Sequence, residues 1–507
     1  MTPRKFSKIL IANRGEIAVR VIRAARDLGI TSAVIYSEAD RDELPVLLAD
    51  EAYGIGPAPS TQSYLQAERI VDLAVDIGAD AVHPGYGFLA ENADFARLCA
   101  DRDVAFIGPP PEAMARMGSK LESRRLMREA GVPIVPGGES ALETVEEAAT
   151  TAGEIGYPVI LKASAGGGGK GMRLVRTADQ LESAYRAARS EALASFGEDA
   201  VYLEKYIERP RHVEIQIMAD QHGKVVSLGE RECSLQRRHQ KVLEEAPSPA
   251  VTSDLRTRMG AAAVAAAETV GYTNAGTVEF LLSSDGTFYF LEMNTRLQVE
   301  HPVTEMVTGL DLVVAQIQVA QGEALGPEFD NVECRGHAIE VRLYAEDAFH
   351  DFIPSPGRIT RLRLPEGPGI RSDCGIREGS EVTIHYDPML GKLIAFGADR
   401  QAAIRRLRRA LAELRIEGVK TNVPLFAALL EDSDFLSGNL DIEMLDRKLA
   451  SGDLAPSFSA ALADLVVMAA AIEYAERRSR RAASPVQDDR RHSWREAGRR
   501  EAVRRMP

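Results

Sequence analysis

The stretch that decides the fold is TVEFLLSSDGTFYFLEMN, residues 277–294. Two strongly apolar runs flank an Asp-Gly pair, which is a strong short-range signal for a β-hairpin. If Asp285-Gly286 forms a two-residue turn, Glu279 pairs directly with Glu292, because the two residues lie equally far from it. Asn294 then falls on the same face as Glu292, because side chains alternate along a strand.

The facing carboxylates predict a metal site. Like charges opposite each other on an apolar ribbon are destabilising, and a divalent cation between them reverses that sign. Glu279, Glu292 and Asn294 offer two carboxylates and an amide oxygen, which suits Mg²⁺ or Mn²⁺ with nucleotide phosphates as further ligands. The alternative is two glutamates on a solvated face, which the neighbouring phenylalanines and leucines disfavour.

The segment after the hairpin continues the polar face. If the chain stays extended, Asn294, Arg296, Gln298 and Glu300 all project to one side. A cation, an amide and a carboxylate in a row predict a small-anion site with a general base beside it.

The run KASAGGGGKG, residues 162–171, is a candidate phosphate loop. Consecutive glycines let backbone N–H groups point at one anion. It is not a Walker A loop, because Gly171 stands where Ser or Thr should follow the lysine. Its GxGxxG match leads into a predicted strand rather than a helix, so we reject a dinucleotide fingerprint. Two interpretations remain: a hairpin that closes over a triphosphate, and a flexible surface hairpin. The glycine run by itself favours neither of them.

The pattern along the chain predicts an α/β protein with α+β parts. Strands and helices alternate at the start, which is typical of a doubly wound parallel layer. A chain of 507 residues suggests about three domains. We expect a doubly wound α/β domain at about residues 1–115, a second domain at about 116–330, and a mixed α/β domain at about 331–450. A helical, basic tail is expected at about residues 451–507, either frayed and flexible in solvent or docked on an acidic partner.

Composition excludes several classes of protein. A formal net charge of −14 argues against a nucleic-acid partner. The four cysteines are scattered and form no CxxC pair, which disfavours a disulfide framework or a zinc site. No apolar run approaches the roughly 18 residues that a membrane span needs, and none resembles a signal peptide. These observations predict a cytoplasmic protein without a membrane partner.

Four long motifs carry a resemblance to a known family: IANRGEIA (residues 11–18), HPGYGFL (83–89), RECSLQRRHQK (231–241) and EMNTRLQVEH (292–301). On these residues the chain resembles the biotin carboxylase family of the ATP-grasp enzymes, over roughly residues 5–447. The resemblance implies a Rossmann-like N-terminal domain and an ATP-grasp domain with a mobile glycine-rich lid at about residues 135–204. It implies a mixed α/β C-terminal domain after them.

The resemblance also implies residue roles. ATP-binding positions are expected at Lys120, Lys162, Gly168, Gly169, Glu204, Lys205, Tyr206, Ile207, His212, Gln236 and His239. Metal ligands are expected at Glu279, Glu292 and Asn294. The bicarbonate site matches Lys241, Arg296, Gln298 and Val299, while Glu300 matches the base and Arg342 matches the arginine near biotin. Catalysis is thus assigned to Lys241, Arg296, Glu300 and Arg342.

The implied reaction is ATP-dependent carboxylation of biotin by bicarbonate through carboxyphosphate, with Mg²⁺ or Mn²⁺. The sequence contains no Met-Lys-Met motif, so we expect biotin on a carrier protein in trans, or a chain that is part of a longer one. The expected partners are a biotin carboxyl carrier protein and a carboxyltransferase subunit, in a homo-oligomer or larger complex. The stretches YAED (344–347) and PSPG (354–357) look most like those of acyl-CoA carboxylases, with pyruvate and urea carboxylases as alternatives.

Two other hypotheses remain open on the sequence. One is a different ATP-grasp ligase that makes an acylphosphate for an amine. The other is a non-enzymatic assembly subunit, which the presence of Lys241, Arg296 and Glu300 disfavours. Bicarbonate-dependent ATP cleavage stimulated by free biotin separates these from a biotin carboxylase.

Overall fold

The computed structural model describes residues 4–138, 140–164, 172–455, 465 and 467–476. The chain forms two compact units, Met1–Ala455 and Pro456–Pro507. In the second unit the described residues are helical and exposed, and the arginine-rich stretch lies outside the described residues. All further description concerns the first unit.

The N-terminal region is built on a parallel sheet with the order β3-β2-β1-β4-β5. Its first helix, α1 (Gly15–Asp27), ends before Gly29, whose φ of +68° is the left-handed conformation that commonly terminates helices. The parallel order confirms the doubly wound layer expected from the alternation of strands and helices. The strands are β1 (Lys8–Ile11), β2 (Thr31–Ser37), β3 (Glu51–Gly56), β4 (Ala81–His83) and β5 (Ala105–Phe106).

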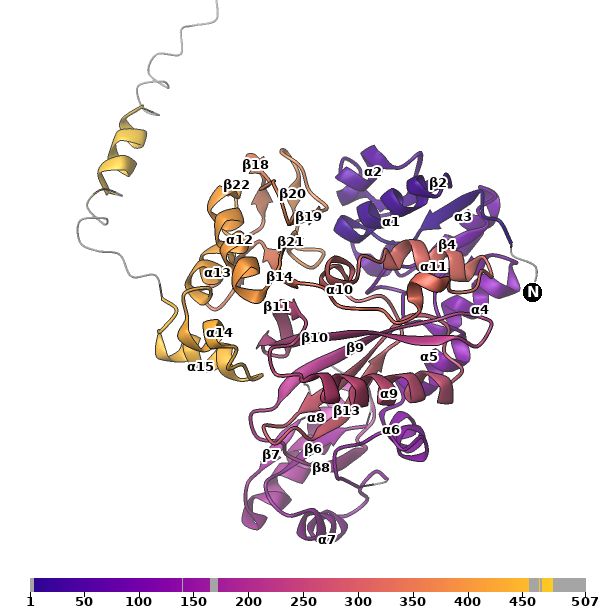
Figure 1. Ribbon diagram of the computed structural model, residues 1–507, viewed down its shortest axis with the longest axis vertical. Helices are drawn as coiled ribbons and strands as arrows, with labels where there is room; N and C mark the ends of the chain where they lie inside the picture. Colours follow the sequence, from indigo (N-terminus) through magenta and orange to yellow (C-terminus); the bar gives the residue numbers. More distant parts are fainter. Residues whose placement is uncertain (1–3, 139, 165–171, 456–464, 466, 477–507) are drawn as a thin grey trace, which may run out of the picture. The chain divides into compact units, whose positions relative to one another are not determined.

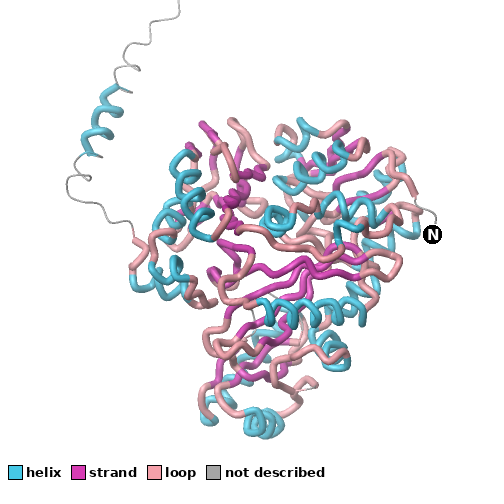
Figure 2. Tube along the Cα trace, viewed as in Figure 1, coloured by secondary structure: helices cyan, strands magenta, loops and turns pink. Residues whose placement is uncertain are grey.

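A long antiparallel sheet runs through the middle of the molecule (Figure 2). Its order is β13-β12-β9-β10-β11-β14-β21-β19, so strands from beyond residue 330 continue the sheet begun by the preceding region. This continuity places Leu243 of β11 opposite Val341 of β14, next to Lys241 and Arg342. The strands are β9 (Arg211–Ala219), β10 (Val225–Arg237), β11 (Gln240–Ala246), β12 (Asn274–Leu282), β13 (Phe288–Asn294), β14 (His337–Tyr344), β19 (Ile370–Cys374) and β21 (Met389–Gly397).

The β12–β13 hairpin forms as predicted, but its turn does not. Residues 284–286 form the loop, with Gly286 at a φ of +82°, so a two-residue Asp-Gly turn is wrong. This loop shifts the register near the turn, where Leu282 pairs with Phe288. A register shift farther along leaves Leu291 as a bulge, and the bulge restores the predicted pairing of Glu279 with Glu292.

A small antiparallel sheet, β7-β6-β8, forms a separate layer covered by α7 (Val145–Ile155) and α8 (Leu181–Phe196) (Figure 1). It comprises β6 (Val159–Ala163), β7 (Arg173–Val175) and β8 (Val201–Lys205). Because β6 and β7 are antiparallel, the glycine run joins two strands, and rejecting the dinucleotide fingerprint was correct. Gly168 and Gly169 lie outside the described residues.

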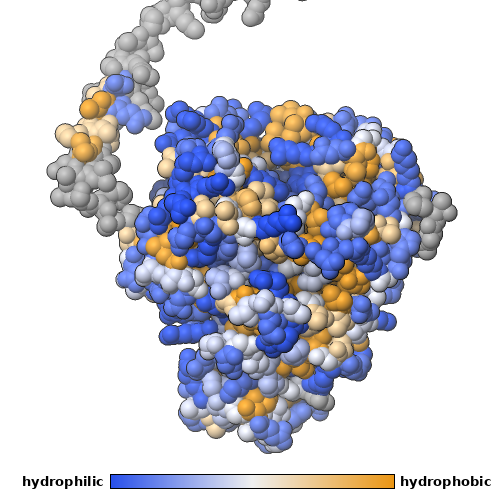
Figure 3. All heavy atoms as spheres, in the orientation of Figure 1, coloured by the Kyte–Doolittle hydropathy of each residue, from blue (hydrophilic) through white to orange (hydrophobic). Residues whose placement is uncertain are grey.

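Helices cover the sheets, and hydrophilic side chains cover much of the outer face visible in Figure 3. No single helix among the described residues is long and apolar enough to cross a membrane; only the bent pair α10 (His301–Thr308) and α11 (Leu312–Ala320), mostly buried in the protein, passes that test jointly. The remaining helices of this unit are α2 (Leu44–Leu48), α3 (Ala67–Asp76), α4 (Ala93–Asp101), α5 (Pro111–Gly118), α6 (Lys120–Glu129), α9 (Ser253–Thr269), α12 (Arg400–Glu413), α13 (Val423–Leu429), α14 (Ser433–Ser437) and α15 (Met444–Ser451). Short strands complete the C-terminal region: β15 (Glu346–Asp347), β16 (Ile353–Pro354), β17 (Gly357–Arg358), β18 (Arg361–Arg363), β20 (Glu381–Val382) and β22 (Arg415–Glu417).

Candidate active site

A cavity of about 630 Å³ collects most of the predicted site residues. Its wall includes Lys120, Lys162, Glu204, His212, Gln236, His239, Lys241, Glu279, Glu292, Asn294, Arg296, Gln298, Val299 and Arg342. A cavity of about 230 Å³ shares part of this wall and adds Lys205, Tyr206 and Ile207. Glu300 lines neither cavity, because it is fully buried beneath Lys241 and Arg342.

Lys241 is the centre of the site. Its Nζ donates hydrogen bonds to Glu214 Oε2 at 2.6 Å, to Glu279 Oε1 at 2.8 Å and to Glu300 Oε1 at 2.7 Å. Burial opposes the charged lysine, but the carboxylates, Glu214 foremost, raise the pKa of Lys241 well above its ordinary value. One cation thus joins three carboxylates from three different segments.

Glu300 is held in its ionised form by two cations. Arg342 Nη2 donates to Glu300 Oε2 at 3.0 Å, and Arg342 Nε donates to Glu244 Oε1 at 2.6 Å. Burial favours the neutral acid, yet Lys241 and then Arg342 lower the pKa of Glu300 well below its ordinary value. The carboxylate is therefore both charged and oriented.

The predicted metal donors lie together at one end of the cavity. Asn294 Nδ2 donates to Glu279 Oε1 at 2.8 Å, and His212 Nε2 lies 2.8 Å from Glu279 Oε2. Partial loss of water around its carboxylate, and then the charge of Glu279, raise the pKa of Glu292, which pairs with Glu279 across the hairpin. Carboxylates that repel each other beside an amide fit a divalent cation, which would relieve the repulsion.

Two lysines at the other end of the cavity favour an anion. Lys120 is the first residue of α6, and Lys162 lies 2.5 Å from Glu204 through its Nζ. Burial, and then the charge of Lys162, lower the pKa of Lys120. A helix N-terminus beside two close lysines is a suitable place for phosphate groups, whose negative charge would favour the charged form of Lys120.

The turn between β10 and β11 brings His239 and Lys241 to the cavity. Arg238 and His239 have φ values of +49° and +66°, the type I′ conformation usually taken by Asn and Gly. Gln236, on the strand before the turn, places its Nε2 2.5 Å from His212 Nδ1. Residues without a preference for this turn mark a position where function outweighs local backbone preference.

The segment after Asn294 converges as predicted but not by staying extended. Arg296 Nη1 donates to Gln298 Oε1 at 3.0 Å, and Gln298 Nε2 lies 3.4 Å from Glu279 Oε1. The strand ends at Asn294, and Glu300 reaches the cluster through a turn that precedes α10. The predicted extended run is therefore wrong, although its four polar residues do meet.

Several partners of the site were not foreseen. Glu91 of the N-terminal region accepts a hydrogen bond from Arg296 Nε at 2.9 Å, and Arg231 Nε donates to Glu214 Oε1 at 2.5 Å. Glu214 had a sequence signal, because it alternates with His212 along β9. Glu91 and Glu244 had none, because their contacts join residues far apart in sequence.

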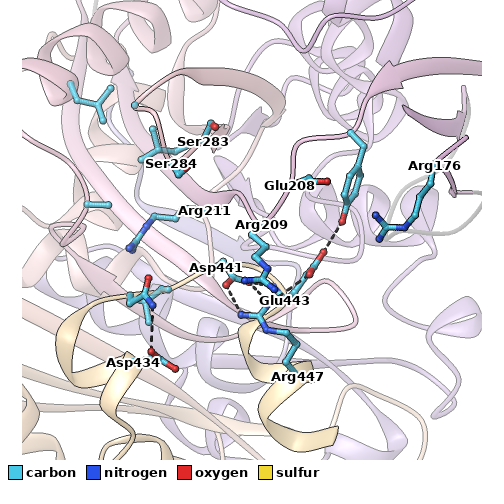
Figure 4. A pocket seen from close by; sticks show the side chains of 17 residues that line it. Arg176, Glu208, Arg209, Arg211, Ser283, Ser284, Asp434, Asp441, Glu443 and Arg447 are labelled. Atoms are coloured by element: carbon cyan, nitrogen blue, oxygen red, sulfur yellow. Dashed lines mark hydrogen bonds and ion pairs between the residues drawn. The ribbon is translucent and has the colours of Figure 1, made fainter. Parts of the chain in front are cut away.

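Another cavity, of about 970 Å³, lies elsewhere (Figure 4). Of the predicted site residues it contains only Tyr206, whose hydroxyl donates to Glu443 Oε1 at 2.6 Å. Arg447 beside it pairs with Asp441 at 2.6 Å. Acidic and basic side chains both line this wall, and Asp441, Glu443 and Arg447 gather in Figure 4, where they pair with one another.

The parallel N-terminal layer, the long antiparallel sheet and the lysine-lined cavity define a ligase of the ATP-grasp class. Residues 5–114 match the biotin carboxylase N-terminal domain, 119–327 the ATP-binding domain of the carbamoyl-phosphate synthase L chain, and 340–447 the biotin carboxylase C-terminal domain. The chain belongs to the biotin carboxylase family, whose members are ATP-dependent carboxylating ligases that use ATP, Mg²⁺, bicarbonate and biotin.

Three relatives illustrate the similarity. A biotin carboxylase of Nostoc sp. is 55% identical, covering 86% of this chain and 98% of its own length. A pyruvate carboxylase subunit of Methanothermobacter thermautotrophicus is 54% identical, covering 87% and 90%. The biotin carboxylase domain dimer of Hydrogenobacter thermophilus 2-oxoglutarate carboxylase, solved with MgADP, ADP and bicarbonate, is 47% identical with a TM-score of 0.85, covering 90% and 100%.

Proposed function

We propose that this chain carboxylates biotin on a separate biotin carboxyl carrier protein, as the biotin carboxylase component of an acyl-CoA carboxylase of the acetyl or propionyl type. The observation that carries the proposal is Lys241, which joins Glu214, Glu279 and Glu300 in the wall of the cavity. This contact connects the proposed metal end to the proposed base, as a reaction between ATP and bicarbonate requires.

ATP is proposed to bind along the two adjoining cavities. Lys120 and Lys162 would contact its phosphates, and Gly168 and Gly169 would cover them. The adenine end would lie along Glu204, Lys205, Tyr206 and Ile207, with His212, Gln236 and His239 completing the wall. Support comes from the two lysines beside a helix N-terminus in the cavity wall, where the charge of Lys162 contributes to a lowered pKa of Lys120.

Mg²⁺ or Mn²⁺ is proposed to bind Glu279, Glu292 and Asn294. When bound, the cation would offset the negative charge that develops during phosphoryl transfer. The two carboxylates themselves support this assignment. The charge of Glu279 disfavours the ionised form of Glu292, and a bound cation would supply the opposite charge that stabilises it.

Bicarbonate is proposed to lie against Lys241, Arg296, Gln298 and Val299, with Glu300 as the base that removes its proton. A charged, oriented carboxylate can accept that proton as the bicarbonate oxygen attacks the γ-phosphorus of ATP. ADP leaves as carboxyphosphate forms, and carboxyphosphate then splits into CO₂ and phosphate beside biotin. The phosphate would take the proton of the ureido nitrogen, which then attacks CO₂. Arg342 would then stabilise the anion that forms on the ureido oxygen of biotin.

The test is ATP cleavage measured with and without bicarbonate and free biotin. We expect cleavage that depends on bicarbonate and increases with biotin. Cleavage that is indifferent to both would refute the proposal and favour another ATP-grasp ligase, whereas no cleavage at all would favour an assembly subunit.

The final acceptor is the finer part of the proposal. The YAED and PSPG stretches support an acyl-CoA, whereas the 54% identity to a component of a pyruvate carboxylase favours a 2-oxo acid as the second candidate. The proposed partners are a carrier protein and a carboxyltransferase subunit, and the Hydrogenobacter dimer supports a homo-oligomer. Capture with a biotinylated carrier, followed by carboxyl transfer to acetyl-CoA or to pyruvate, separates the two acceptors.

A further inference from the structure

Lys392 is a second buried lysine near Glu300, and the proposed mechanism gives it no role. It lies on β21, is 1% exposed, and is not among the described residues that line the active-site cavity. Burying an ammonium costs several kcal/mol unless strong partners offset the loss of water. Its partners therefore indicate what this lysine is retained for.

One partner is the backbone of the proposed bicarbonate segment. Lys392 Nζ donates to the Val299 carbonyl at 2.6 Å, which is short for an N–H···O bond. Val299 directly precedes Glu300, the residue that begins the turn into α10. The lysine thus holds the main chain at the point where it presents the proposed base.

The sheet places Lys392 beside Arg342. The two residues are directly opposite each other on β21 and β14, so their side chains emerge on the same face. Arg342 binds the Glu300 carboxylate, while Lys392 binds the carbonyl just before it. Two neighbouring cations on one rigid sheet therefore hold two consecutive residues of one turn.

The other partner ties this turn to the N-terminal region. Lys392 Nζ lies 3.1 Å from Glu16 Oε1, on the first turn of α1. Glu16 also accepts a hydrogen bond from the Tyr86 hydroxyl, and the Tyr86 ring centroid lies 5.9 Å from Lys392 Nζ. Lys392 therefore links motif residues of the N-terminal region to the proposed base through the Val299 carbonyl.

We infer that Lys392 is a positioning residue that fixes the Val299–Glu300 turn for bicarbonate. The inference rests on the proposed function of that turn. Lys241 and Arg342 orient the Glu300 side chain, and Lys392 orients the backbone that carries it. Loss of the Lys392 side chain should displace Val299 and Glu300 together. This displacement impairs the use of bicarbonate more than that of ATP, because the ATP-binding residues lie on other segments.

The experiment compares Lys392→Met, which keeps the length and removes the charge, with Lys392→Arg, which keeps the charge. The matched control is Lys224→Met, because Lys224 also donates to backbone carbonyls, those of Leu325 and Gly326, and pairs with Asp330. We expect Lys392→Met to raise the KM for bicarbonate roughly tenfold or more while the KM for ATP stays within about twofold. Lys392→Arg should recover part of the loss, and Lys224→Met should change neither constant.

Equal increases in both KM values, or no change in either, would overturn the positioning role. If Lys392→Met does not fold, the double variant Glu16→Gln/Lys392→Met removes both buried charges, and the same selective loss for bicarbonate is expected of it. A wild-type protein without bicarbonate-dependent ATP cleavage would refute the proposed function itself, so the two failures are distinct.

Discussion

Lys241 and Lys392 are two buried lysines that hold the same short turn from different sides. Lys241 lines the cavity and binds three carboxylates, whereas Lys392 binds one carboxylate and one backbone carbonyl outside it. The contacts of Lys241 involve the proposed metal ligand and base, so bound substrates can replace them. The contacts of Lys392 are structural. The comparison teaches that a lysine's partners, rather than its burial, determine whether it takes part in chemistry or supports it.

The largest effect that tests this comparison is expected at Glu300, which Lys241 contacts directly. Glu300→Gln keeps the shape of the side chain and removes the base. We expect bicarbonate-dependent turnover to fall by about 10²–10⁴-fold, the usual contribution of a general base. Steady-state kinetics at saturating ATP measure it, with Lys224→Met as the unaffected control. Turnover within tenfold of wild type would contradict the role of Glu300.

The metal end gives the next largest effect. Glu292→Gln removes the charge opposite Glu279 and leaves Lys241 in place. We expect metal-dependent turnover to be lost, because one anionic ligand is missing. Any residual activity should require a Mg²⁺ concentration at least roughly tenfold higher than wild type does. Activity measured against Mg²⁺ concentration tests this. An unchanged Mg²⁺ dependence at near-normal activity would show that the cation is held by other residues.

At the phosphate end of the cavity, Lys120→Met should weaken ATP binding without lowering the stability of the protein. We expect the KM for ATP to rise roughly tenfold, because one phosphate contact is lost. The melting temperature without ATP should stay the same or rise, because the substitution relieves repulsion from Lys162. Thermal unfolding with and without ATP measures both effects. A lower melting temperature without ATP would mean that Lys120 pairs with an anionic group of the protein itself.

The smallest expected effect is on stability alone. Glu340 on β14 is fully buried, and burial, then Glu244 among its neighbours, raises its pKa well above the ordinary 4.5, with Lys392 and Arg342 opposing the shift. Its proton-linked contribution to stability is present below pH 4.5 and is lost as pH rises toward the raised pKa, at about 1.4 kcal/mol per pKa unit.

Glu340→Gln remains neutral, so its free energy of unfolding should fall less than that of wild type over this range. Chemical denaturation at pH 5 and pH 8 provides the comparison. If the two proteins lose stability in parallel with rising pH, Glu340 is ionised in the native state.

The hairpin shows how far local reasoning reaches. The apolar runs predicted both strands and the Glu279–Glu292 pair, yet the assumed turn was wrong and the bulge at Leu291 compensated for it. Turn length and bulges depend on how the sheet twists against its neighbours, which the pattern of side chains does not encode. The prediction of an extended run after Asn294 was wrong for a similar reason, because α10 packs against β14 and requires a turn before it.

By itself, the sequence determined the family, the α/β class, the ATP-using chemistry and many residues of the cavity wall, because those features reside in local patterns and long motifs. Only the tertiary structure decided which charges share a partner. Glu214, Glu244, Glu91 and Lys392 come from separate segments, and the continuous sheet brings three of them to the turn at Glu300. Buried charges must be paired to be tolerated, and that pairing is set by strand order and register rather than by neighbours along the chain.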